Sequence, residues 1–126
     1  DSTSSSNEAL DAAKSIALQY KIVVAVTGEV DYVTDGNKTL SVYGGDIMMT
    51  KITATGCALT CLIGAGLTTD QDTITSTANI MGIYSLAAEV ASNNCEGPGS
   101  LKVKFLDSLY NITPEQVNEK IKISRI

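Results

Sequence analysis

The amino-acid sequence predicts an α/β fold in one domain, and three observations lead to this prediction. The chain has 126 residues, the length of one ordinary domain, and 44% of them are hydrophobic. It has no Trp and a single Phe, so its core must be aliphatic, as in proteins whose buried strands are rich in Val and Ile. A helical pattern is directly followed by such a strand, and this order is half of a βαβ unit.

The first predicted elements are a helix over residues 8–20 and a strand over residues 21–27. Ser5 and Glu8 have the spacing of a capping box at the helix start. The run from Lys21 to Thr27 is apolar and β-branched, so we expect a strand that is buried on both faces, with a further strand before residue 1. Apolar residues recur at helical spacing in the helix, namely Leu10, Ala13, Ile16 and Ala17.

A hairpin and a buried helix are predicted next. Residues 31–34 and 39–43 are strand-like, and residues 35–38 form a hairpin turn between them. Residues 46–53 suit either a strand or an extended loop. Residues 57–66 have almost no polar side chain, and a helix that is apolar all round must be buried. Gly64 and Gly66 either allow close packing of this helix or end it.

The rest of the chain is predicted to be helical. A polar start at residues 68–72 leads into a helix that runs to about Ser92, and a loop covers residues 93–99. Ser100 can cap a helix over residues 101–110. The segment 113–116 is a strong helix start, because it combines a capping Thr, Pro at the first helical position and Gln three residues after the cap.

Composition excludes several classes of protein. The formal net charge of -5 rules out a nucleic-acid binder with a broad basic face and disfavours docking on an anionic membrane. No apolar run reaches the roughly 18 residues that a membrane helix needs. Cys57, Cys61 and Cys95 occur without any His, which argues against a disulfide framework, a Cys/His zinc site and a His general base. We therefore expect a cytoplasmic protein.

The first candidate site is the segment from Thr50 to Cys57, which leads into the apolar helix. Small residues at a helix start let the backbone approach a ligand, and the free amides and the helix dipole attract an anion, most often phosphate. Cys57 lies in the same field, which makes it a candidate base or nucleophile. The alternative is a tight turn with a buried structural cysteine, and for Cys61 we expect only a core position.

The second candidate site is the end of the predicted strand, residues 26–32. Ligands of open α/β sheets bind beyond the carboxyl ends of strands, and Thr27, Glu29 and Asp31 place a hydroxyl and two carboxylates there. A polar strand end with a turn at Gly28 explains the same residues equally well. Neither segment has the spacing of a Walker A motif.

Three segments together resemble the hydroxyethylthiazole kinase family. Residues 26–36, Val-Thr-Gly-Glu-Val-Asp-Tyr-Val-Thr-Asp-Gly, are similar to the family segment with the same Thr-Gly-Glu-Val-Asp run. Residues 50–59, Thr-Lys-Ile-Thr-Ala-Thr-Gly-Cys-Ala-Leu, resemble its anion-hole motif, which other ribokinase-like enzymes share. Residues 96–100, Glu-Gly-Pro-Gly-Ser, resemble a third landmark, and the three occur in the family's order along the chain.

This resemblance implies a ribokinase-like layered α/β/α fold, with residues 1–126 as the C-terminal half of a single domain. The implied enzyme transfers the γ-phosphate of ATP to the hydroxyl of 4-methyl-5-(2-hydroxyethyl)thiazole, a salvage step toward thiamine. The family is a homotrimer that binds its substrate at subunit interfaces and needs Mg²⁺. Its N-terminal half carries the acidic Mg²⁺ residues, so the resemblance predicts no metal ligand on this chain.

Individual roles also follow from the resemblance. Thr27 matches a nucleotide-binding Thr, and Thr55 and Gly56 line the anion hole that receives the nucleotide's phosphate. Cys57 lines the same hole, contacts the substrate and takes the place of the catalytic Asp of most ribokinase-like enzymes. Ala54 replaces a Gly whose backbone lies against the substrate, and it costs strain if that position needs a positive φ.

Two other functions remain open from the sequence. A pyrimidine-precursor kinase of hydroxymethylpyrimidine type has a similar anion-hole motif, although the run from Thr27 to Asp31 argues against it. The chain also suits a non-catalytic fragment that binds nucleotide or assembles with a partner.

Overall fold

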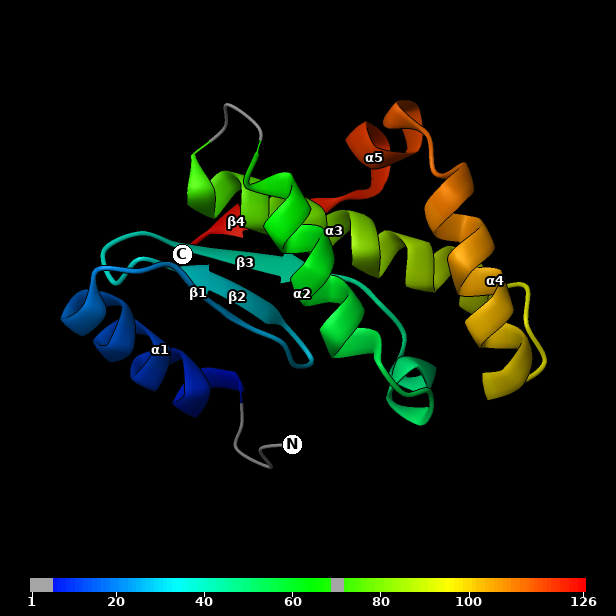
Figure 1. The fold of residues 1–126 in the computed structure, drawn as a ribbon, viewed down its shortest axis with the longest axis horizontal. Coiled ribbons are helices and arrows are strands. Elements are labelled where there is room, and N and C mark those ends of the chain that lie inside the picture. Colours follow the sequence, from blue (N-terminus) through cyan, green and yellow to red (C-terminus); the bar gives the residue numbers. More distant parts are fainter. Residues whose placement is uncertain (1–5, 69–71) are drawn as a thin grey trace.

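The computed structural model describes residues 6–68 and 72–126, which form helices around a sheet (Figure 1). The strands are β1 (Val24–Val26), β2 (Asp31–Thr34), β3 (Thr39–Tyr43) and β4 (Lys122–Arg125). The helices are α1 (Ser6–Tyr20), the 3-10 helix η1 (Ile47–Lys51), α2 (Thr55–Gly66), α3 (Thr73–Ser92), α4 (Pro98–Asn111) and α5 (Pro114–Lys120). Ser5, the predicted partner of Glu8 in a capping box, lies outside the described residues.

The sheet is a four-stranded antiparallel layer with the strand order β1-β2-β3-β4. Helix α1 packs against β1 and β2, whereas α3 packs against β2, β3 and β4. Tyr32, Val33 and Thr34 of β2 are all buried, and successive side chains of a strand point to opposite faces, so both faces of β2 are covered. Figure 1 shows α1 on one side of the sheet and α2 and α3 on the other, which is a layered α/β/α arrangement.

The main core lies between the sheet and α3. Helix α4 and helix α2 pack on α3 from outside, so α3 is the most buried helix of the described chain. The buried cluster is aliphatic, as the composition predicts, and Phe105 is its single Phe. Its largest contributors are Val33, Leu40 and Val42 from the sheet, Met81 and Tyr84 from α3, and Leu101 and Phe105 from α4.

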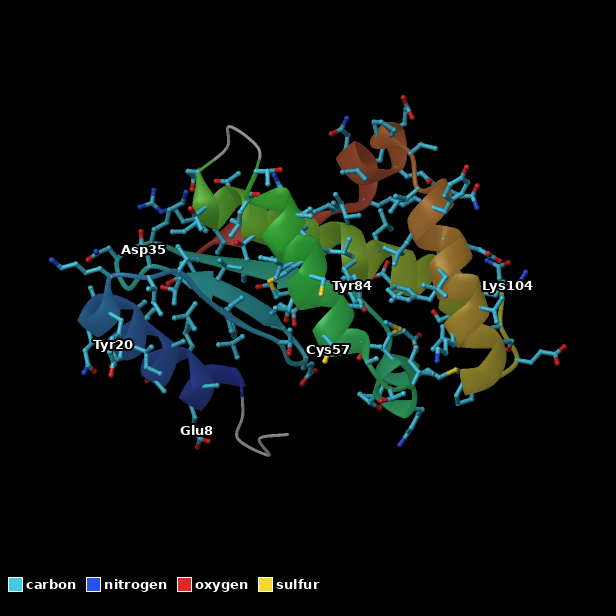
Figure 2. All side chains as sticks on the ribbon, in the orientation of Figure 1. Glu8, Tyr20, Asp35, Cys57, Tyr84 and Lys104 are labelled. Carbon is cyan, nitrogen blue, oxygen red and sulfur yellow. The ribbon has the colours of Figure 1, made fainter. Side chains whose placement is uncertain are left out.

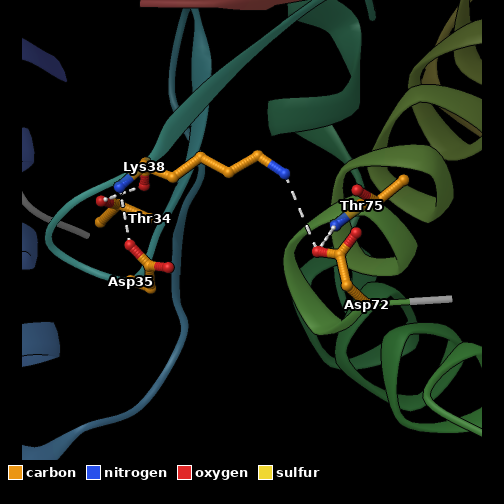
Figure 3. A network of polar contacts seen from close by, with 5 residues as sticks. All are labelled: Thr34, Asp35, Lys38, Asp72 and Thr75. Carbon is orange, nitrogen blue, oxygen red and sulfur yellow. Dashed lines mark hydrogen bonds and ion pairs between the residues drawn. The ribbon is translucent and has the colours of Figure 1, made fainter.

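The hairpin turn between β2 and β3 is closed by side-chain hydrogen bonds (Figure 3). The carboxylate of Asp35 accepts from the amides of Asn37 and Lys38 at 2.8 and 2.7 Å, and the hydroxyl of Thr34 donates to the carbonyl of Lys38 at 2.9 Å. The ammonium of Lys38 lies 3.9 Å from the carboxylate of Asp72, which caps α3 by accepting from the amide of Thr75. The turn and the start of α3 therefore form one polar network.

The structure corrects two predicted elements and adds one strand. The strand over residues 21–27 is reduced to Val24–Val26, and it is not buried on both faces, because Ala25 is exposed and β1 is the edge of the described sheet. Residues 46–53, predicted as a strand or an extended loop, contain the 3-10 helix η1 (Ile47–Lys51), and Asp46 caps it by accepting from the amide of Met48. Strand β4 has no predicted counterpart.

Helix α2 differs most from its prediction. It is apolar all round, but only Leu59 and Gly66 are buried, because α2 packs on α3 along one narrow side. Gly66 does permit close packing, since a Cβ there would lie 2.8 Å from Ile80, whereas nothing lies near Gly64. Thr55 and Ile63 are half-buried, and the other residues of α2 are exposed in this chain.

Candidate active-site cleft

An open cleft of about 680 Å³ lies beyond the ends of β1 and β3. It lies where Thr27 follows β1, Gly44 and Gly45 follow β3, and Thr55 opens α2. Helix α3 forms its floor through Tyr84, Ser85 and Ala88. Smaller hollows of about 370 Å³ between α3, α4 and α5 and of about 340 Å³ between α1 and β1 lie elsewhere.

The start of α2 leaves its backbone amides open to this cleft. Ala54, the residue before the helix, has φ 69° and ψ 9° and provides no side-chain capping bond. An unpartnered helix start leaves its first amides without an acceptor and carries the positive end of the helix dipole. Nothing lies within 4 Å of the position that a Cβ at Gly56 would take, so the space above this turn is empty of protein atoms.

The left-handed backbone of Ala54 answers the question that its replacement of Gly raised. The position does need a positive φ, which costs an L-residue on the order of 1 kcal/mol relative to Gly. Lys21 is the other described non-Gly residue with a positive φ, and it lies just after α1. The chain therefore carries some backbone strain directly at the start of α2.

The strand side of the cleft holds the second predicted segment. Thr27, Glu29 and Asp31 all line it, and Asp31 accepts a hydrogen bond from the amide of Gly28 at 2.9 Å. Burial raises the pKa of Asp31, and the hydrogen bond from Gly28 opposes that shift. The turn is thus held by its own carboxylate, in agreement with a structural role for Gly28 and Asp31.

The third wall is the loop after β3. Gly44 and Gly45 have φ values of 135° and 91°, a region that favours glycine. The amide of Gly45 donates to the carboxylate of Glu89 on α3 at 3.1 Å. The loop is therefore tied to α3, and it leads through Asp46 into η1.

The structure brings most of the predicted site residues together. Thr27, Thr55 and Gly56 line the same cleft. Ala54 directly precedes Thr55 in the turn that leads into α2. Cys57 is exposed in the first turn of α2 and is not among the lining residues (Figure 2). Cys61, one turn further along α2, is also exposed, so the prediction of a core position for Cys61 is wrong.

Tyr84 is a residue of the cleft that the sequence did not single out as functional. Its hydroxyl donates to the carbonyl of Thr55 at 2.7 Å, and its ring meets Phe105 edge to face with centroids 4.8 Å apart. In the sequence it is only one apolar position on a helical face. Figure 2 shows Tyr84 on α3 in the middle of the molecule, behind α2.

The described residues do not by themselves fit a metal site. In the described part of the chain no three His, Cys, Asp or Glu side chains are grouped closely enough to hold an ion. No helix among the described residues is both long and apolar enough to cross a membrane.

The fold and the cleft together define an α/β protein of ribokinase-like architecture, with its main cleft at strand ends and at the start of a helix. The hydroxyethylthiazole kinase family model matches residues 1–115, and the chain belongs to this family. The hydroxyethylthiazole kinase of Zea mays is 43% identical over 125 residues, which cover 98% of this chain and 45% of that protein. That of Citrobacter koseri is 43% identical over 116 residues, 92% of this chain and 44% of that protein.

A solved structure supports the same relationship. The hydroxyethylthiazole kinase protein from Pyrococcus horikoshii OT3 superposes with a TM-score of 0.89 at 33% sequence identity, over 95% of this chain and 47% of that one. The ribokinase-like fold class predicted from the sequence is thereby confirmed. The chain spans about half the length of the relatives it matches.

Proposed function

We propose that this chain is the C-terminal half of an enzyme that transfers the γ-phosphate of ATP to the hydroxyl of 4-methyl-5-(2-hydroxyethyl)thiazole, in thiamine salvage. One observation carries the proposal. In a chain of the hydroxyethylthiazole kinase family, Thr27, Thr55 and Gly56 come from two distant segments and line one cleft at the uncapped start of α2.

The start of α2 suits a phosphoryl group. The amides of Thr55, Gly56 and Cys57 belong to the first turn, where they have no partner within the helix. Together with the positive end of the helix dipole, such amides hold and stabilise the negative oxygens of a transferring phosphoryl group. We assign Thr27, across the cleft, to the nucleotide, and we assign the left-handed turn at Ala54 to the substrate side.

Cys57 is the proposed catalytic residue. It is exposed in the first turn of α2, directly after Gly56 of the cleft lining, and it is therefore free to meet a substrate. As a thiolate, its sulfur would orient the hydroxyl of the thiazole alcohol or accept the proton of that hydroxyl. In phosphoryl transfer most of the rate comes from positioning and charge stabilisation, so this contribution is partial.

The remaining features concern the complete enzyme. ATP use follows from the kinase family. We infer that the enzyme uses Mg²⁺, held by residues of the other half of the enzyme, because the family resemblance implies acidic Mg²⁺ residues there. We further infer a homotrimer with interfacial sites, supported by the exposed apolar surface of α2, and a reducing cytoplasmic location, supported by three unpaired cysteines.

The test is a phosphorylation assay with the complete enzyme that contains this sequence. It is supplied with ATP, Mg²⁺ and either 4-methyl-5-(2-hydroxyethyl)thiazole or a hydroxymethylpyrimidine, and the phosphorylated products are measured by mass spectrometry. We expect product from the thiazole alcohol alone. Phosphorylation of the pyrimidine in its place would favour the pyrimidine-precursor kinase, and binding of ATP without any product would favour a non-catalytic fragment.

A further inference from the structure

We infer that Tyr84 is a positioning residue for phosphoryl transfer, which acts by fixing the backbone of Thr55 at the start of α2. This inference rests on the proposed function. It concerns a side chain that touches the cleft from α3 and that contacts α2 through its hydroxyl.

The hydrogen bond of Tyr84 reaches a functional turn rather than an ordinary surface. Its hydroxyl donates at 2.7 Å to the carbonyl of Thr55, the first residue of α2. The amides of that same turn are the proposed ligands of the phosphoryl group. Because a peptide unit is planar, a bond that fixes the carbonyl of Thr55 also fixes the direction of the amide of Gly56, which belongs to the same peptide.

Beyond the backbone bonds of the helix itself, which begin with the amide of Ala58 donating to the carbonyl of Ala54 at 3.0 Å, the start of α2 has few constraints. Ala54 provides no capping side chain, and no protein atom approaches the position of a Cβ at Gly56. The helix is otherwise held to α3 by Leu59, Ile63 and Gly66, further along its length. Tyr84 is thus the side chain on α3 that ties down the first residue of α2.

The ring of Tyr84 is itself held firmly. The side chain is only 7% exposed, and Phe105 of α4 packs against it edge to face, with an interplanar angle of 77°. Burial raises the pKa of Tyr84, so its hydroxyl keeps its proton at neutral pH and remains a donor. A rigid donor of this kind can hold a backbone group within the few tenths of an ångström that catalysis requires.

The experiment replaces Tyr84 by Phe in the complete enzyme, which removes the hydroxyl and keeps the ring against Phe105. A matched control, Thr39→Val, removes a buried hydroxyl that bonds the hydroxyl of Thr34 at 2.9 Å, at the opposite end of the sheet. The assays are run at a temperature at which the thermal melts show both variants to be fully folded. We expect kcat of Tyr84→Phe to fall about tenfold with KM for both substrates within about twofold, and kcat of Thr39→Val to stay within about twofold of the wild type.

A second measurement separates positioning from general loosening. ADP with aluminium fluoride imitates the phosphoryl group in flight, so its affinity reports the transition-state contacts. We expect Tyr84→Phe to bind ADP with aluminium fluoride about tenfold more weakly than the wild type. Its affinity for ADP alone should equal that of the wild type.

Either of two results would overturn the inference. One is a kcat of Tyr84→Phe within about twofold of the wild type, and the other is an equal loss in Thr39→Val. If the wild-type enzyme does not phosphorylate the thiazole alcohol, it is the proposed function that fails, and this is established before any variant is made.

Discussion

Two helices that pack on each other, α2 and α3, begin in opposite ways. The start of α3 is capped by Asp72, which accepts from the amide of Thr75 and pairs with Lys38 of the hairpin turn (Figure 3). The start of α2 follows Ala54 in a left-handed conformation, has no capping side chain and opens into the main cleft. At the start of α3 a side chain accepts a hydrogen bond from a backbone amide and stabilises the helix. At the start of α2 the backbone amides have no such acceptor, so they are available to a ligand.

The largest expected effect concerns Gly56, at the open start. Gly56→Val places a branched side chain where a phosphoryl group would approach the backbone, so we expect turnover of the complete enzyme to fall about a hundredfold or more. Because no protein atom lies near the new Cβ, the free energy of unfolding should change by less than about 1 kcal/mol. Steady-state assays and thermal melts measure both quantities. Normal turnover, or a variant that merely unfolds, would contradict the phosphoryl-binding role of this helix start and would favour the alternative of a purely structural tight turn.

The next effect concerns Cys57. Cys57→Ala should lower kcat about tenfold to a hundredfold, because a base or orienting group is lost while the amides remain. Cys57→Asp should fold and retain activity, since the residue is exposed and a carboxylate in the first turn of a helix interacts favourably with the dipole.

Cys61 is the control for Cys57. It is exposed one turn further along α2, so Cys61→Asp should fold as well, in contrast to what a core position would predict. Cys61→Ala should leave kcat within about twofold of the wild type. A Cys57→Asp variant that unfolds would contradict the exposed position of Cys57 in the first turn of α2.

A smaller effect tests the strain at the open start. Ala54→Gly should stabilise the fold by up to about 1 kcal/mol, because Gly adopts a positive φ without steric cost. The greater loss of backbone entropy of Gly on folding offsets part of this gain. Lys21→Gly relieves the same kind of strain after α1, far from the cleft. Both should raise the melting temperature, and Ala54→Gly alone should change KM for the thiazole alcohol. Equal KM values for the thiazole alcohol in the two variants would contradict a contact between Ala54 and the substrate.

The smallest effect concerns the capped start. A side-chain and a backbone hydrogen bond from Thr75 lower the pKa of Asp72, and Lys38 adds to this. A carboxyl group with a lowered pKa stabilises the fold above its unfolded-state pKa, and this contribution is lost as the pH falls through its folded-state pKa. Asp72→Asn should therefore melt slightly earlier than the wild type at pH 7, and the difference should vanish in strong acid. Its kcat should not change, and a loss of activity would link the hairpin end to the cleft.

The elements set by local chemistry were predictable from the sequence. The hairpin of β2 and β3 was confirmed, because Asp35 and Lys38 close the turn by bonds between near neighbours. The start of α5 was confirmed in the same way, since Thr113 and Gln116 exchange the bonds of a capping box. Thr27, Thr55 and Gly56 line one cleft, and the roles that the family motifs imply for them stay predictions.

The elements set by distant contacts were not predictable. Strand β4 is mostly exposed and is defined by its pairing with β3, from the other end of the chain. The apolar composition of α2 gave no information on how much of its surface other elements cover. Tyr84 has the same appearance in the sequence as a core residue, and its importance comes from a bond to Thr55, 29 residues away.

Helix α3 has 20 residues, which corresponds to a rod of about 30 Å, and it reaches from Asp72 in the hairpin network to Glu89 beside the cleft. Inserting one residue before Tyr84 would rotate the rest of the helix by about 100° and would turn both Tyr84 and Glu89 away from their partners. The length of α3 between these residues is therefore constrained by the contacts at both places. Differences in chain length between relatives should accumulate in connections such as residues 93–97 and should spare the helix itself.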